Sequence, residues 1–269
     1  METVADFLTR DRRSGRPALV DATGRTYDTH WVCTSAWKAG NFLRHTGVRG
    51  GVTVGVVGDG PLALLSFFGT ALLSGRTWFE PPSSLDGYPE VRTLVAPADR
   101  VDAYDADAPI QRVCYGGDPP APEIHHLDAG LWSENPSFPP TDIGSETPLL
   151  VDATVSGDKD ADPGAPAASI SHGEAIAQAR SIAAEFDVGP GTRVVVGPTA
   201  FARAGPFADP RVVVAGVLAP LVADGVTVLS PMEATPGEPT ADDLVLGPNE
   251  SEPISGRRLP LSAVELDGS

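Results

Sequence analysis

The chain has 269 residues, of which 41% are hydrophobic, and its net charge is -17 at pH 7. This length can bury one large core or two modest ones. A surface this acidic repels phosphate backbones and anionic lipid headgroups, so we expect neither a nucleic-acid-binding nor a membrane-binding protein.

The first half of the chain predicts two helices, each followed by a strand. Apolar residues at a period of about 3.6 predict an amphipathic helix over residues 29–45. The valines of residues 52–57 are typical of a buried parallel strand. A second, apolar helix is predicted over residues 61–74, with Gly75 placed to end it, and residues 76–80 are expected to be extended.

The middle of the chain, residues 81–148, is rich in Pro, Asp and Gly. We expect it to link the two halves, with short strands at residues 93–96 and 111–114.

The second half repeats the order of the first. Helices are predicted over residues 173–186 and 212–223, and strands over residues 193–196 and 226–229. Pro220 should kink the second of these helices, and Gly225 should end it. The polar, Pro- and Gly-rich tail from Met232 onward has one strand candidate at residues 244–246, and we expect it to be loosely ordered.

The two halves also share a sequence repeat, because Val48–Val57 resembles Val188–Gly197. Helix–strand–helix–strand, seen twice, predicts an α/β fold with two pseudo-repeated subdomains whose mostly parallel sheets are covered by helices. The predicted domain spans residues 1–231, with the repeats at about 17–80 and 149–231 joined by 81–148, and the tail is 232–269.

This order of elements resembles the N-terminal domain of the acyl-CoA synthetases, within the AMP-dependent synthetase/ligase (adenylate-forming) superfamily. The resemblance covers roughly residues 4–231 and implies two pseudo-symmetric α/β subdomains. It rests on segments in both halves of the chain: Pro17–Tyr27, Gly47–Val54, Leu73–Arg76, Ser169–His172, Val188–Val194 and Gly216–Leu221.

The signature of that family departs from its pattern here. Family members carry a Ser/Thr/Gly-rich phosphate loop that ends in Pro-Lys-Gly, where this chain has Pro166-Ala-Ala. Four residues remain as degenerate phosphate-binding remnants by resemblance: Thr154, Ser156, Gly157 and His172. Close to them, Asp158, Asp160 and Asp162 surround Lys159 and would repel a triphosphate.

His172 has a second interpretation, which is structural. Ser171 is a good helix N-cap, and Glu174 completes a capping box. We therefore expect no catalytic residue in the chain, since the family's ribose-binding aspartate and catalytic lysine have no counterpart after Pro231 either.

Three other patterns are weaker. Asp158–Gly164 resembles a calcium loop, but its glycine is one position late and no glutamate closes it, so an acidic loop explains it better. Gly55–Gly60 lies where phosphate loops occur, but a tight strand-to-helix turn accounts for its glycines. His125 and His126 beside Asp128 lack a third ligand at helical spacing, and we predict no metal site.

The charge and cysteine patterns bear on the compartment. Only Lys38 and Lys159 are lysines among 19 basic residues, an Arg-rich and acidic composition typical of a halophilic, for example haloarchaeal, protein. A GC-rich genome would explain the arginines but not the acidity. Cys33 and Cys114 should be free thiols, and the start of the chain is not a signal peptide, so we expect a soluble cytoplasmic protein.

Two functional hypotheses follow from the resemblance. The first is a degenerate, non-catalytic synthetase-like protein that acts as an interaction or regulatory module, as a homodimer or with a full-length synthetase. The alternative is a residual acid–CoA ligase, acetyl-CoA synthetase-like, or an acyl-adenylate or CoA binder completed by a partner chain. We expect no cofactor in the first case, and ATP or AMP with Mg, or CoA, in the second.

Overall fold

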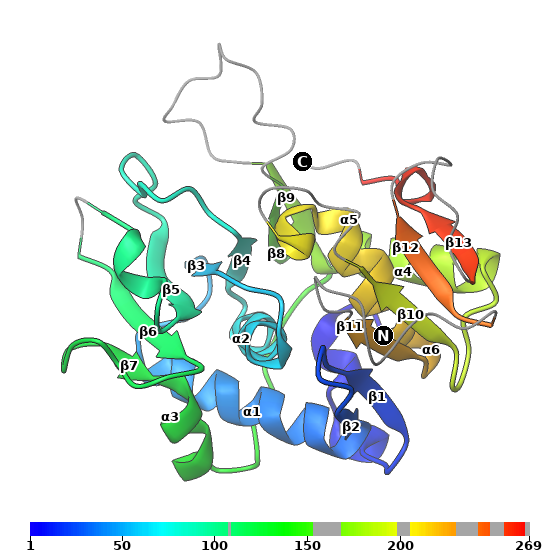
Figure 1. Ribbon diagram of the computed structural model, residues 1–269, viewed down its shortest axis with the longest axis horizontal. Coiled ribbons are helices and arrows are strands. Elements are labelled where there is room, and N and C mark those ends of the chain that lie inside the picture. Colours follow the sequence, from blue (N-terminus) through cyan, green and yellow to red (C-terminus); the bar gives the residue numbers. More distant parts are fainter. Residues whose placement is uncertain (107–108, 153–167, 198–204, 230–241, 248–255, 267–269) are drawn as a thin grey trace.

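The computed structural model describes residues 1–106, 109–152, 168–197, 205–229, 242–247 and 256–266. These residues form two mixed, mostly parallel β-sheets, and Figure 1 shows helices lying between and beside them. The predicted α/β class is therefore confirmed.

One sheet contains seven of the described strands. They are β3 (Thr53–Val56), β4 (Arg76–Phe79), β5 (Val91–Pro97), β6 (Gln111–Tyr115), β7 (His125–His126), β8 (Pro148–Asp152) and β9 (Ala168–Ser171). Their order is β7-β6-β5-β3-β4-β8-β9, and all neighbours are parallel except the antiparallel hairpin β8–β9. The two strands predicted at residues 93–96 and 111–114 are confirmed as β5 and β6.

The other sheet contains six described strands. They are β1 (Pro17–Val20), β2 (Thr26–Asp28), β10 (Arg193–Val196), β11 (Val226–Leu229), β12 (Leu244–Gly247) and β13 (Arg257–Pro260). Their order is β13-β12-β10-β11-β1-β2, again parallel except for the hairpin β1–β2.

Each sheet includes a hairpin from the opposite half of the chain. β1 and β2 begin the first repeat, but β1 pairs with β11 of the second; β8 and β9 begin the second repeat, but β8 pairs with β4 of the first. This exchange ties the two sheets together, because the chain crosses between them at each hairpin.

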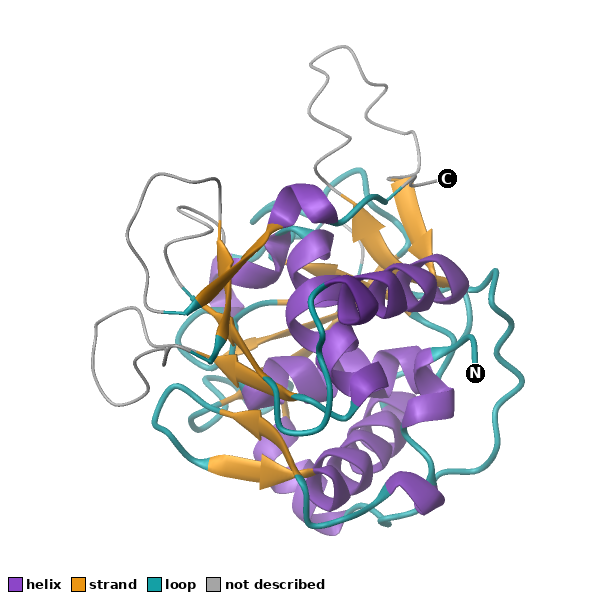
Figure 2. Cartoon of the chain, turned by 90° about the vertical axis from the view of Figure 1, so that its right-hand side faces the viewer, coloured by secondary structure: helices purple, strands orange, loops and turns teal. Residues whose placement is uncertain are grey.

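The predicted helices are confirmed. They are α1 (Thr29–His45), α2 (Pro61–Leu72), α4 (His172–Glu185), and a segment formed by α5 (Pro210–Val213), a π-helical turn (Val214–Leu218) and α6 (Ala219–Ala223); a short α3 (Leu127–Ser133) adds to them. α2 lies between the sheets (Figure 1), and ten of its twelve residues are buried, which explains why its sequence is apolar on all sides. Figure 2 shows the helices of the chain packed beside its strands.

The predicted effect of Pro220 takes the form of the π-helical turn. Pro220 has no N–H to donate to the carbonyl of Gly216, four residues earlier, and its ring would collide with that carbonyl in a regular helix. The side-chain hydroxyl of Thr227 on β11 donates to the Gly216 carbonyl at 2.8 Å instead. The sheet thus replaces the hydrogen bond that the proline removes.

The two halves of the internal repeat also share an equivalent backbone hydrogen bond. The N–H of Gly51 donates to the Ser74 carbonyl at 3.3 Å, and the N–H of Gly191 donates to the Asp224 carbonyl at 3.4 Å. Both glycines have a positive φ, 80° and 84°, which is strained for other residues.

The prediction that Gly75 and Gly225 end their helices is wrong by one position. The left-handed residues are Ser74 (φ 56°) and Asp224 (φ 60°), which directly precede Gly75 and Gly225. The glycines serve close packing, because a Cβ on Gly75 would lie 2.9 Å from the Thr70 methyl.

The expectation of a loosely ordered tail is wrong for its described residues. The strand predicted at residues 244–246 is confirmed as β12, and it pairs with β10 and with the unpredicted β13. Leu244, Leu246 and Leu259 are fully buried, so tertiary contacts order a segment that its composition made look polar.

Two further expectations concern thiols and membranes. Cys33 and Cys114 are confirmed as free thiols, and both are buried. Within the part of the chain that the structure describes, every helix is too short or too polar to cross a bilayer.

Candidate functional site

The sequence places its candidate site in the connection between β8 and β9. Thr154, Ser156 and Gly157 lie in that connection, outside the described residues, and so does the acidic segment with Asp158. His172 directly follows β9 and is the first residue of α4. The structure therefore places one of the four predicted residues.

His172 is completely buried and connects the start of the chain to α4. Its Nδ1 accepts a hydrogen bond of 3.1 Å from the N–H of Val4, in a 3-10 turn over Val4–Phe7. An imidazole that accepts at Nδ1 carries its proton at Nε2. That Nε2 atom has no hydrogen-bond partner among the described residues.

Burial also sets the charge of this ring. It lowers the pKa of His172 from 6.5 to about 4, although the nearby carboxylate of Asp6 acts in the opposite direction. The imidazole is thus neutral at neutral pH. Because none of its surface is exposed, a ligand cannot touch it in this conformation.

The structural interpretation of the motif around His172 is confirmed. The N–H of Glu174 donates to Ser171 Oγ at 3.2 Å, and the N–H of Ser171 donates to the Glu174 carboxylate at 3.4 Å. The backbone N–H of His172 also donates to the Thr147 carbonyl at 3.0 Å. These contacts fix the beginning of α4 without any ligand.

A second cluster, which sequence reasoning missed, lies at the carboxyl ends of β3 and β4. The N–H of Gly58 donates to Glu80 Oε1 at 2.6 Å, and Arg100 donates to Glu80 Oε2 at 3.0 Å. The Glu80 side chain is 8% exposed, and its backbone has a left-handed φ of 47°. Strained residues at strand ends mark many functional sites, but no pattern in the sequence singles out Glu80.

The Glu80 cluster also bears on whether Gly55–Gly60 forms a phosphate loop or a tight turn. Gly58 has a φ of 102°, and its amide, which a phosphate would use, already binds a carboxylate of the protein itself. The turn is thus closed by an internal anion, in agreement with its interpretation as a tight strand-to-helix connection.

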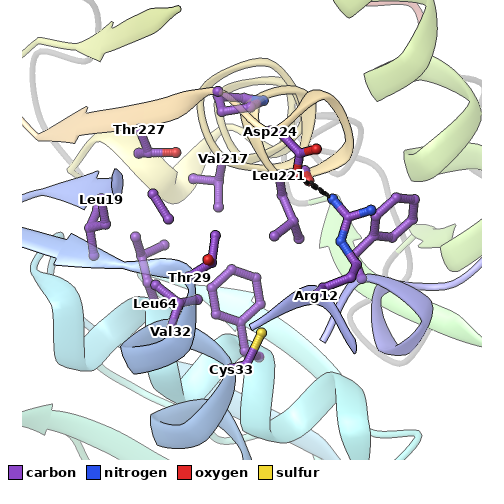
Figure 3. A pocket seen from close by; sticks show the side chains of 15 residues that line it. Arg12, Leu19, Thr29, Val32, Cys33, Leu64, Val217, Leu221, Asp224 and Thr227 are labelled. Atoms are coloured by element: carbon purple, nitrogen blue, oxygen red, sulfur yellow. Dashed lines mark hydrogen bonds and ion pairs between the residues drawn. The ribbon is translucent and has the colours of Figure 1, made fainter. Parts of the chain in front are cut away.

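A small cavity lies between β1, α1, α2 and α6, as Figure 3 shows. Its volume of about 40 Å³ has room for only a few water molecules, since each needs roughly 10–15 Å³ by this measure. Cys33 lines it, but burial raises the pKa of that thiol to about 11, so it is not a reactive nucleophile.

One edge of this cavity is closed by an ion-pair cluster. Arg12 donates to one oxygen of Asp224 at 2.8 Å (Figure 3). Arg16 donates to the same oxygen at 2.9 Å, and Arg12 also donates to the Leu221 carbonyl at 3.2 Å. The cluster fastens the start of the chain to the end of α6, which is a structural role.

The candidate metal residues are not gathered into a site. His125 Nε2 lies 3.1 Å from Gln111 Oε1, while His126 Nε2 lies 3.5 Å from Asp128 Oδ2. In the described ranges, no three His, Cys, Asp or Glu side chains come close enough together to hold a metal ion.

The sequence matches no protein-family model and no curated protein. The fold, in contrast, matches solved structures of adenylate-forming enzymes over most of the chain. A nonribosomal peptide synthetase, FmoA3, bound to α-methyl-L-serine-AMP, matches 85% of the chain with a TM-score of 0.64 and 20% identity. The N-terminal domain of FACL13 from Mycobacterium tuberculosis matches 87% with a TM-score of 0.63 and 18% identity.

A third solved structure, ATP-bound MatB from Rhodopseudomonas palustris, matches 91% of the chain with a TM-score of 0.64 and 13% identity. The chain spans 23% of the FmoA3 structure, 58% of the FACL13 domain and 49% of MatB. The expected fold, that of the N-terminal domain of adenylate-forming enzymes, is therefore confirmed.

Proposed function

We propose that this chain is a non-catalytic relative of the acyl-CoA synthetases that serves as an interaction or regulatory module. The observation that carries the proposal is the state of His172, the one predicted site residue that the structure places. It is wholly buried and bound to the Val4 amide, and its neighbours Ser171 and Glu174 form a helix cap. These contacts give the motif a structural role that needs no ligand.

The chemistry of the neighbouring donors supports the same conclusion. In the sequence, Asp158, Asp160 and Asp162 fall within the segment that corresponds to the family's phosphate loop, and the charge of Lys159 alone does not balance theirs. The Pro-Lys-Gly of the family is replaced by Pro166-Ala-Ala. These residues are a poor fit for Mg-ATP.

We also propose that this module has a protein partner, either a second copy of this chain or a full-length synthetase. A partner that docks on an apolar face needs large hydrophobic side chains at the surface. Among the described residues, however, Met1 and Trp132 are the only large hydrophobic side chains that are exposed. The described surface therefore favours a partner that binds through a polar interface rather than through an extensive apolar one.

The test is thermal unfolding in multimolar KCl, which also suits the halophilic protein that we propose, with Mg-ATP, AMP or CoA added. A ligand at a hundredfold excess over its dissociation constant adds about 2.7 kcal/mol if it binds only the folded chain. We expect no shift with any of the three. A shift with ATP or AMP would refute the proposal and favour the residual ligase, and light scattering in the same buffer would show whether the chain self-associates.

A further inference from the structure

A groove of about 440 Å³ runs along the outer side of α1, between the β1–β2 hairpin and α3. Its volume lies within the range of small-molecule sites, roughly 300–1,000 Å³. One wall is formed by Pro61 and Leu62, the first residues of α2, which follows β3.

That wall lies at a topological switch point of the seven-stranded sheet. β3 and β5 are neighbours in the sheet. β4, which follows β3 in the chain, lies on the far side of β3, whereas β6, which follows β5, lies on the far side of β5. Open α/β sheets bind ligands outside the carboxyl ends of strands at such a point. The position is distinct from the β8–β9 connection, because β3, which leads into α2, lies two strand spacings from β8, about 10 Å.

Aromatic side chains supply the walls of this groove. Tyr27 and Trp31 pack with ring centroids 4.2 Å apart on one side. Trp132 on α3 lines the other side with 88% of its surface exposed. An indole left this open in a groove that a second indole also lines offers a stacking surface for a planar ring.

The two cations that line the groove have no carboxylate partner among the described residues, whereas its two carboxylates accept hydrogen bonds from internal donors. Lys38, the lysine of the described chain, donates to the Leu131 carbonyl at 3.0 Å and has no carboxylate partner among the described residues. Arg25 lies 4.9 Å from the centroid of the Tyr27 ring, also without a described ion-pair partner. α2 adds a helix N-terminus with no side-chain cap and no acidic residue in its first turn.

The two carboxylates that also line the groove are held by internal donors. Asp21 accepts from the hydroxyls of Thr23 and Tyr27 at 2.6 Å and 2.8 Å. Asp128 accepts from the N–H of Gly116 at 3.0 Å. Both are thus less available to a ligand than the cations are.

We propose that this groove binds a small planar aromatic molecule that carries one anionic group. The ring stacks against Trp132 and Trp31, and the anionic group lies toward Lys38 and Arg25. This proposal does not rest on the proposed function, because the groove lies apart from the β8–β9 connection and its test uses ligands without ribose or phosphate.

The experiment is isothermal titration calorimetry of the full chain, at both moderate and high salt, with three probes. Indole-3-acetate has the ring and the anion, tryptamine has the ring with a cation, and cyclohexylacetate has the anion without an aromatic ring. We expect indole-3-acetate to bind most tightly, and more weakly as salt screens the charges.

The variants Trp132→Ala and Lys38→Gln should each weaken indole-3-acetate binding, the first by about tenfold, as the loss of a stacking partner does. Trp132→Ala should fold normally because its side chain is exposed, and Arg92→Gln, an exposed arginine outside the groove, is the matched control. Absence of indole-3-acetate binding, equal or tighter binding of tryptamine, or unchanged affinity in Trp132→Ala would each overturn the proposal.

Discussion

Acid should destabilise this protein through His172 before its carboxylates protonate. The pKa of His172 is about 4 in the folded chain, against 6.5 for an ordinary histidine, because the ring is buried. A lowered pKa means that the unfolded chain binds the proton more tightly than the folded chain does. The stabilising contribution is therefore complete above pH 6.5, is lost as the pH falls below that value, and levels off below about pH 4.

The size of the effect follows from these two values. Between about pH 7.5 and about pH 5, the free energy of unfolding should fall by about 2 kcal/mol through this residue alone. Protonation would also remove the Nδ1 lone pair that accepts from the Val4 N–H at 3.1 Å. The assay is urea unfolding followed by tryptophan fluorescence across that pH range, at constant KCl.

A variant separates this residue from the many carboxylates. In His172→Asn, the side-chain oxygen can still accept from Val4, but nothing titrates, so its stability should be lower at neutral pH and nearly flat down to about pH 5. His30→Asn, at an exposed position, should keep the slope of the wild type. Parallel curves for the wild type and His172→Asn would refute the reasoning.

Three other predictions concern packing, each measured by denaturant unfolding. Thr227→Val should cost about 1–3 kcal/mol because the Gly216 carbonyl loses its hydroxyl donor, whereas Thr227→Ser should cost less; equal losses would contradict this. Gly58→Ala should cost roughly 2–4 kcal/mol, since φ is 102° and the new Cβ would collide with a buried tyrosine hydroxyl, while Gly60→Ala, which meets open space, is the control. Ala18→Val should add about 0.5–1 kcal/mol by filling the cavity of about 40 Å³, and a loss would show that the site is already closed.

Local sequence patterns predicted most of the secondary structure. The predicted helix of residues 29–45 is α1, and the valine runs are β3 and β10, because helix and buried-strand periodicities are properties of adjacent residues. The capping box at Ser171 was equally readable, since both of its hydrogen bonds join residues three apart.

Other features depend on residues far apart in the chain. The contact of His172 with Val4 spans 168 residues, and Glu80 becomes notable only where it meets Gly58 and Arg100. β13 has no strong strand signal, and it forms because β12 offers it a parallel partner and Leu259 a buried position. The members of such pairs are too far apart in the sequence to belong to one helix or strand pattern, so periodicity and propensity do not predict their contacts.

The sequence by itself determined the α/β class, the helix–strand repeat and the family likeness, since each is written in residues close together. Only the tertiary structure decided that each sheet includes a hairpin from the other half, and that His172 is buried rather than open to a ligand. It also brought Tyr27, Lys38 and Trp132 to one groove. The physical reason is that burial and strand pairing arise from packing between distant segments, which hydrophobic burial drives without regard to their separation in the chain.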